Sequence, residues 1–311
     1  MNPLIQLKTA TPLFLIALLL ACFGVVPLAR AVLPAPAPDG GYPGGNTAEG
    51  INALHDVNTA VGINNTAVGF NALTSDTTGQ YNVAVGSGAL ASNTTGNFNM
   101  AIGTEALRDN NANFNLAIGF RVGFMNTTGR HLTGIGAAAL RNNTIGSFNT
   151  AIGADALREN TIGVQNTAIG ADALSNNKQG GNNTATGFEA LLHNTTGNFN
   201  TANGQLALFS NTEGTFNSAV GQGALFSNTL GSHNTASGAG ALFSNDTASD
   251  NTAIGFQALN DNTTGSPNTA CGYQALYSNT SGVDNVAVGS GALVSNTHGG
   301  GNVAAGTSAL A

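Results

Sequence analysis

Apolar and polar positions along most of the chain recur with a 17-residue period, and a clear copy of the unit is NTAIGADALRENTIGVQ at residues 149–165. The glycine that closes the NTAxG segment recurs once per period from Gly69 to Gly306, apart from one step of 16 between Gly103 and Gly119. A fixed period of this length is typical of solenoids, in which each unit stacks on its neighbours and none is stable alone.

The unit favours strands over helices. Seventeen residues are too few for a helical hairpin repeat, and the apolar positions show no helical period. We therefore expect an all-β fold, a parallel β-solenoid of about 15 coils in residues 46–311, whose short strands pair between neighbouring coils at ~4.8 Å and form a rod ~70 Å long. Residues 46–64 are an irregular start and residues 65–311 are regular. The sequence stops within a unit, and solenoid ends need polar caps. We therefore expect either a fragment, which is the favoured interpretation, or a partner that covers this end.

Alternation along the first strand predicts which side chains face the interior. We number each unit from its Asn, so that position one is Asn149 and position seventeen is Gln165 in the copy above. Positions two and four, Thr150 and Ile152, share a face, and we expect that face to line the core. The Ala and Gly of positions three and five would then form a bare outer face. Such a face either closes the coil tightly or receives a neighbouring subunit.

Two further columns are expected to hold the coils together. Position nine is Leu in every regular unit except at Gly123, and a fully buried Leu contributes roughly 2 kcal/mol. Asn recurs at positions one and twelve, where an amide can hydrogen-bond from coil to coil and can mark a corner. The predicted core ladder includes Leu140, Leu157, Leu174, Leu191, Leu208 and Leu225.

The repeated NTAIGxxAL core with its turn-forming tail resembles the head repeats of trimeric autotransporter adhesins. It is also similar to the Asn-Thr-Gly repeat arrays of bacterial surface and tail-fibre proteins. The resemblance covers most of residues 46–311 and implies a left-handed parallel β-roll that assembles as a trimer. The period of 17 is longer than is usual in those adhesin heads, which leaves the cross-section and handedness of the coil open.

The N-terminus has the pattern of an export signal. Residues 1–31 contain Lys8, an apolar run over residues 13–26 and an Ala-Arg-Ala cleavage site, which predicts cleavage before Val32. A membrane anchor is an alternative, although the run is short for a span of ~20 residues. Lipoprotein processing, with acylation of Cys22, is a second alternative to cleavage before Val32. We expect a secreted or cell-surface bacterial protein whose mature repeat domain does not insert into a membrane.

The composition of the chain after the predicted export signal limits the kinds of molecule that it can bind. Residues 32–45 are rich in Pro and Gly and predict an extended linker. Six basic residues then remain against fifteen acidic ones, a net charge of about −9, which gives no electrostatic means of holding nucleic acid or an anionic membrane. Cys271 stands where other units have Ile or Val, so we interpret it as a small buried hydrophobe.

Aromatic residues recur in two columns that are candidates for binding. Exposed aromatic rows mark interaction surfaces. Two interpretations stay open: a binding stripe for a glycan or a protein, or rings that pack on each other along the rod or inside a subunit interface. Position ten holds Phe209, Phe226, Phe243 and Tyr277, and position seventeen holds Tyr81, Phe98, Phe114, Phe148, Phe199 and Phe216.

Catalytic and metal chemistry has little support in the sequence. Position seven stacks Asp155, Asp172 and Glu189, whose repulsion a Ca²⁺ ion could neutralise, but Arg141 and Arg158 offer a simpler counter-charge. These carboxylates are therefore a weak candidate metal site, and no cofactor is expected. The histidines are scattered over different coils with no acid partner pattern, so we expect no enzyme.

We therefore expect a non-enzymatic, secreted or cell-surface fibre or adhesin-like repeat protein that acts as a binding or structural scaffold. It would form a homotrimer and contact an unknown surface ligand, a glycan or a protein. The alternative is an ice- or surface-binding monomeric β-solenoid, whose Thr columns would match a lattice. Against this alternative, position four is mostly Ile or Val rather than polar.

Overall fold

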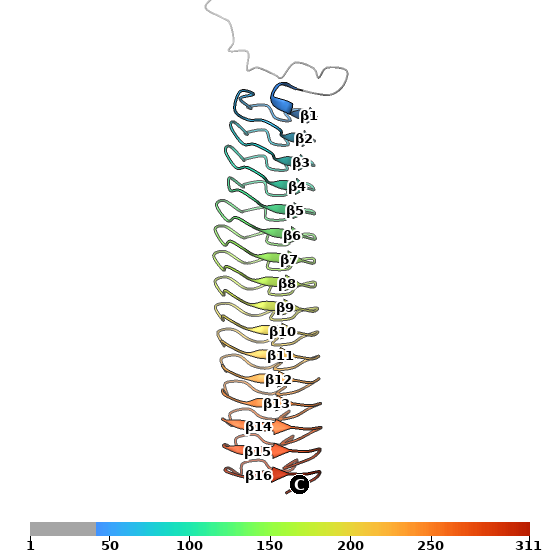
Figure 1. Cartoon of the computed structure of the whole chain (residues 1–311), viewed down its shortest axis with the longest axis vertical. Coiled ribbons are helices and arrows are strands. Elements are labelled where there is room, and N and C mark those ends of the chain that lie inside the picture. The colour runs from blue at the N-terminus through green and yellow to red at the C-terminus, as the bar shows by residue number, and fades with distance from the viewer. Residues whose placement is uncertain (1–41) are drawn as a thin grey trace, which may run out of the picture.

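The computed structural model describes residues 42–311, which wind into a straight rod of stacked coils (Figure 1). Sixteen strands of three or four residues form one parallel sheet, in which β1 to β16 follow one another in chain order. The predicted parallel β-solenoid with its 17-residue period is confirmed. The strands are β1 Thr47–Glu49, β2 Thr66–Val68, β3 Val83–Val85, β4 Met100–Ile102, β5 Leu116–Ile118, β6 Thr133–Ile135, β7 Thr150–Ile152, β8 Thr167–Ile169, β9 Thr184–Thr186, β10 Thr201–Asn203, β11 Ser218–Val220, β12 Thr235–Ser237, β13 Thr252–Ile254, β14 Asn268–Cys271, β15 Asn285–Val288 and β16 Val303–Ala305.

The rod begins with a coil that is longer than the others. The predicted export signal and most of the predicted linker lie outside the described residues. The end of the linker forms a short 3-10 turn, η1 Pro43–Gly45. Thr47 of β1 pairs with Thr66 of β2, so the irregular start is a complete coil that exceeds the regular period. Within residues 42–311, no helix is long and apolar enough to cross a bilayer.

Backbone hydrogen bonds join every coil to both of its neighbours. The Thr167 N–H donates to the Asn183 carbonyl of the following coil at 2.8 Å, and the Gly170 N–H donates to the Ile152 carbonyl of the preceding coil at 2.8 Å. Because the register is parallel and in step, equivalent positions lie directly above one another. Each position of the unit therefore becomes a column of side chains along the rod.

The strand side chains face the opposite way from the sequence prediction. Ala151 at position three is fully buried, whereas Ile152 at position four is 37% exposed. Position two is half-buried or exposed throughout the sheet. The assignment of positions two and four to the core is therefore wrong. Leu157 fills the interior from the other wall of the coil together with Ala156, which leaves room opposite them only for the methyl group of an alanine.

The alanine of position three is consequently buried inside the coil, and the glycine of position five is half-buried, which favours the interpretation of this face as a tightly closed coil. At position five the glycine makes close contact with the backbone of the next coil. Gly170 has φ of +130°, and a Cβ there would lie 2.5 Å from the Gly187 carbonyl oxygen. Glycine is required at this position both by its backbone conformation and by the space available.

The predicted leucines lie in the centre of the coil. Leu174 is fully buried, as are the leucines of its column from Leu73 to Leu276, whereas Leu310 in the last coil is 65% exposed. The Leu174 N–H donates to the Ala190 carbonyl at 3.0 Å. Its φ of +53° lies in the left-handed region, which costs an ordinary residue roughly 1–2 kcal/mol. Burial of the side chain and the hydrogen bond to the next coil offset this cost.

The one coil that lacks this leucine is repacked by its neighbours. Gly123 occupies position nine, and a Cβ there would approach Leu107 Cδ2 to 2.9 Å. Val122 replaces the usual alanine beside it and is fully buried. Gly134 in the next coil has no side chain because Val122 fills that space, and Leu132 replaces the usual buried asparagine. The core volume is thus redistributed over two coils.

Both asparagine columns are hydrogen-bonded from coil to coil, as predicted, and the structure shows that they are also buried along most of the rod. At position twelve, Asn177 Nδ2 donates to Asn160 Oδ1 at 2.9 Å and to the Gly180 carbonyl at 2.9 Å. At position one, the Asn183 N–H donates to Asn166 Oδ1 at 3.0 Å, and Asn166 Nδ2 donates to the Gly180 carbonyl at 2.8 Å. These amides satisfy the buried turns and fix the register between coils.

The position-twelve ladder is interrupted where the period is 16. Asn93 Oδ1 is buried without a partner. In the shortened coil, Asn110 Nδ2 donates to the Ala112 carbonyl at 3.0 Å, and no bond from it to Asn93 forms. The missing turn residue thus leaves one orphan acceptor, which is a local weak point of the rod.

At the N-terminal end of the same ladder, an aspartate replaces the asparagine. Asp76 is fully buried and accepts hydrogen bonds from Asn93 Nδ2 at 2.9 Å and from the Gly79 N–H at 3.2 Å. Burial raises the pKa of this carboxyl from its ordinary value of 3.8 to about 6, against the opposing effect of the bonds from Asn93 and Gly79.

We predict that Asp76→Asn stabilises the chain at neutral pH. The folded pKa lies above the unfolded one, so the folded state holds the proton more tightly and stability falls as pH rises from about 3.8 to about 6. At about 1.4 kcal/mol per pH unit, the cost above pH 6 is at most about 3 kcal/mol. Urea unfolding of parent and variant at pH 4 and pH 7 measures this loss of stability.

Glu213→Gln, which removes an exposed carboxylate, is the control. A variant that keeps the parent's pH dependence would contradict this assignment.

Candidate functional site

The sheet presents a regular surface made by positions two and four of β1–β16, which we call the outer sheet face. Its apolar members are substantially exposed, for example Ile169 at 40%, Val220 at 44% and Ile254 at 46%. Cys271 also lies on this face and is exposed, so its interpretation as a buried hydrophobe is wrong. The reason is the same reversal of strand faces, because Cys271 occupies position four of β14.

Position seventeen forms a ladder of stacked rings, the Tyr81 stack. Centroids of successive rings lie 4.9–5.2 Å apart, with planes within 8° of parallel. Its phenylalanine and tyrosine side chains are 46–52% exposed. The rings therefore pack on one another along the rod and also present their edges to solvent. The members are Tyr81, Phe98, Phe114, His131 and Phe148.

Sequence reasoning missed the histidine in this stack. The sequence prediction assigns His131 to no column, although it lies one period after Phe114 and one period before Phe148. A second short stack repeats the pattern, since His233 follows Phe199 and Phe216. Counting by the period would have found both histidines.

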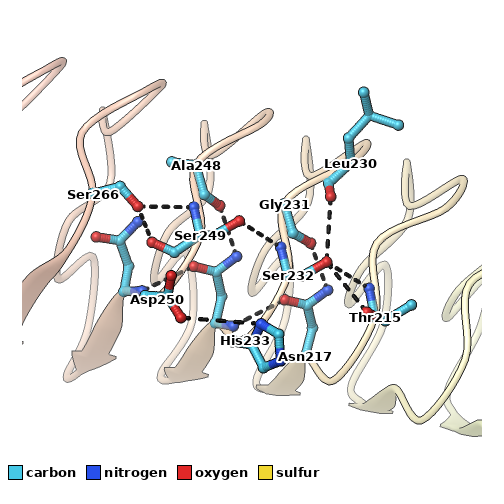
Figure 2. Close-up of polar contacts among 12 residues, drawn as sticks. Thr215, Asn217, Leu230, Gly231, Ser232, His233, Ala248, Ser249, Asp250 and Ser266 are labelled. Carbon is cyan, nitrogen blue, oxygen red and sulfur yellow. Dashed lines mark hydrogen bonds and ion pairs between the residues drawn. The ribbon is translucent and has the colours of Figure 1, made fainter.

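Hydroxyl groups form a ladder beside the second stack (Figure 2). The backbone N–H of each residue donates to the hydroxyl of the next at 3.0 Å in the series Thr215, Ser232, Ser249 and Ser266. Position sixteen thus satisfies the backbone of the turn from coil to coil. Asn97 and Asn198 do the same elsewhere, through their side-chain oxygens.

A serine, a histidine and an aspartate lie near one another here, and their geometry is not that of a proton relay. His233 Nδ1 lies 4.0 Å from Asp250 Oδ1 (Figure 2). Both side chains are well exposed, and the His233 ring stacks on Phe216 at 5.3 Å. The Ser232 hydroxyl accepts from the Thr215 backbone instead of bonding to the histidine. A nucleophile activated by a base needs a direct hydrogen bond between the two groups.

The position-ten aromatics lie on another side of the coil. Phe209, Phe226 and Phe243 stack with centroids 5.0 and 4.9 Å apart. Tyr277 does not join them, because Asn260 occupies position ten in the intervening coil. The proposed ladder of four is therefore a stack of three with a separate tyrosine. Beside Phe226 and Phe243 lies an open groove of about 550 Å³.

The acidic column of position seven is neutralised in part by arginine. Arg158 Nη1 lies 3.4 Å from Asp155 Oδ1, and Arg158 Nε lies 2.8 Å from Glu159 Oε1. The bond with Glu159 raises the pKa of the arginine. In the described part of the chain, no three His, Cys, Asp or Glu side chains, including those of Asp155, Asp172 and Glu189, are grouped to hold a metal ion.

The fold and the surfaces together define the class of protein as a β-solenoid. Its polar side chains serve mainly to hold neighbouring coils together, and its outer faces carry columns of repeated side chains. Comparison with models of known protein families, with curated proteins and with solved structures found no match.

Proposed function

We propose that this protein is a non-enzymatic fibre or adhesin-like repeat protein, exported to the cell surface or secreted, that serves as a binding or structural scaffold. The observation that carries this proposal is the continuous parallel sheet of 16 strands, which displays the same side-chain positions at every step of the rod. Repetition of this kind supports multivalent contact or assembly, because each coil adds an equivalent contact.

The use of polar groups supports a scaffold rather than a catalyst. The buried asparagines donate to neighbouring amides and turn carbonyls, as Asn194 does to Asn177 and Gly197. The hydroxyls of position sixteen cap backbone N–H groups in the same way. Groups committed to stacking in this way have no free hydrogen bond with which to activate a nucleophile.

The outer sheet face supports self-association, and we propose a homotrimer. Its position-four column is apolar over long stretches, and those side chains are half-buried or exposed along the rod. A contiguous apolar surface of this kind marks a site of protein contact. This assigns the subunit contact to positions two and four, in place of the bare Ala and Gly face.

Light scattering on the purified chain at several concentrations tests the assembly. We expect a mass three times that of one chain. Ile152→Lys combined with Ile169→Lys should reduce it to a monomer, because each buried lysine would need desolvation. Ile162→Lys places the same change on an exposed turn residue off the sheet and should leave the trimer intact.

The Cys271 thiol gives a second readout. It should react slowly with a thiol reagent in the trimer and rapidly in the double lysine variant, because it lies on the same face. A parent chain that is monomeric at all concentrations would contradict the trimer and favour the monomeric alternative.

Ice or crystal-surface binding remains the second candidate. Positions two and four point outward together on a regular sheet, and in β9 both are threonine, Thr184 and Thr186. β10 and β12 carry Thr201 with Asn203 and Thr235 with Ser237. Thermal hysteresis of the monomeric chain tests this candidate, and its absence would remove it.

A further inference from the structure

We propose that the groove beside Phe226 and Phe243 is a binding site for a neutral oligosaccharide. The inference rests on the proposed scaffold function and adds to it the class of ligand.

The groove forms where two successive coils lack a side chain at position seven. Gly223 and Gly240 occupy this position, with φ of +62° and +65°. Most other coils carry a longer side chain there in the same left-handed conformation, as at Asp172, Glu189 and Gln257. Ala239 at position six adds little bulk. The missing side chains leave room for the hollow of about 550 Å³.

One wall of the groove is aromatic. The Phe243 ring extends over the backbone of the preceding coil, with its Cε2 atom 3.3 Å from the place of a Cβ on Gly223. Phe243 ends the stack, because the next coil has Asn260 at position ten. It is 37% exposed, and no aromatic ring of the described residues stacks on its other face. Leu206 and Phe256 add further apolar surface to the lining.

Amide side chains supply the polar groups of the groove. Asn260 Nδ2 donates to the Gly240 carbonyl at 2.9 Å, which leaves its oxygen free to accept. Gln257 Oε1 accepts from Gln274, which leaves the Gln257 Nε2 group free to donate. Gln222 lines the groove as well. No lining residue is ionisable, so a charged ligand would find no counter-charge here.

This combination fits the two sides of a sugar ring. The ring has an apolar C–H face, which the negative face of an aromatic ring attracts, and a rim of hydroxyls, which amides can both donate to and accept from. A purely apolar ligand would leave most of its surface in water in an open groove. The lining spans four successive coils, or ~14 Å at the spacing of parallel strands, which exceeds a single sugar ring.

The test is binding of neutral hexasaccharides to the full chain, measured by saturation-transfer NMR and calorimetry. The probes are cello-, manno- and chitohexaose, with an oligogalacturonate as the anionic comparison. We expect saturable binding of at least one neutral probe. Phe243→Ala should weaken it about tenfold, as for an aromatic anchor. Gly240→Asp, which restores the residue type of Asp172 at this position, should abolish it.

Two matched variants control for folding. Phe209→Ala removes a ring of the same stack that does not line the groove, and Gly291→Asp changes a position-seven glycine outside it. Both should bind within about twofold of the parent, since they leave the groove unchanged. Far-UV circular dichroism must match the parent in every variant.

Three outcomes would overturn the proposal: no neutral probe saturates, Phe209→Ala costs as much as Phe243→Ala, or the anionic probe binds as well as the neutral ones. A groove that takes only an apolar side chain of a protein partner would appear as the first of these. If the chain is a trimer but binds no oligosaccharide, only the proposed oligosaccharide site is contradicted. If the chain is a monomer and binds an oligosaccharide, only the proposed trimer is contradicted.

Discussion

Gly170→Ala is expected to lower the free energy of unfolding by about 2–6 kcal/mol. The φ of +130° is nearly closed to residues with a Cβ, which costs about 1–3 kcal/mol. The new methyl would also meet the Gly187 carbonyl carbon at 2.7 Å, and overpacking of this kind costs about 1–3 kcal/mol more. The Gly187 N–H is bonded to the Ile169 carbonyl at 2.8 Å, so the coils cannot simply separate. Urea unfolding followed by circular dichroism measures the change.

Gly291→Ala separates the two contributions. Gly291 has φ of +65°, and the nearest atom to an added Cβ is Ser308 Oγ at 3.6 Å. Only the left-handed backbone is strained there, at a cost of roughly 1–2 kcal/mol. Equal destabilisation by the two substitutions would mean that the contact between glycines of adjacent coils is not what requires glycine at position five.

Leu174→Ala is expected to cost about 2–5 kcal/mol, because the side chain is fully buried and its neighbours in the column cannot collapse into the cavity. Leu157 and Leu191 lie one coil away on either side and would each lose a packing surface. Backbone hydrogen bonds hold the coils at a fixed spacing, which limits relaxation. The denaturation midpoint should fall while the m-value stays close to that of the parent.

Ile162→Ala is the matched control for the leucine. Ile162 is 44% exposed in a turn, so removal of its side chain should change the free energy of unfolding by less than about 1 kcal/mol. Hydrogen exchange near residues 157–191 should rise in Leu174→Ala and not in Ile162→Ala. If the leucine variant costs no more than the control, position nine does not form the core.

The candidate sites differ in how far the sequence predicts them. The aromatic columns follow directly from the period, since residues one period apart lie above one another, as Phe209 and Phe226 do. The groove does not follow in this way. It depends on how position-ten side chains lean across position seven of the preceding coil, as Phe243 does over Gly223. Two glycines in successive units were its only signal in the sequence.

The sequence by itself determined the period, the parallel sheet and the identity of every column, because in-register stacking places equivalent residues together whatever the shape of the coil. Only the tertiary structure decided which strand face is inside. Alternation separates Ala151 from Ile152 but is symmetric between interior and exterior. The leucines, turned inward by a left-handed backbone at position nine, occupy the centre, and the narrow space that remains admits alanine and leaves isoleucine outside.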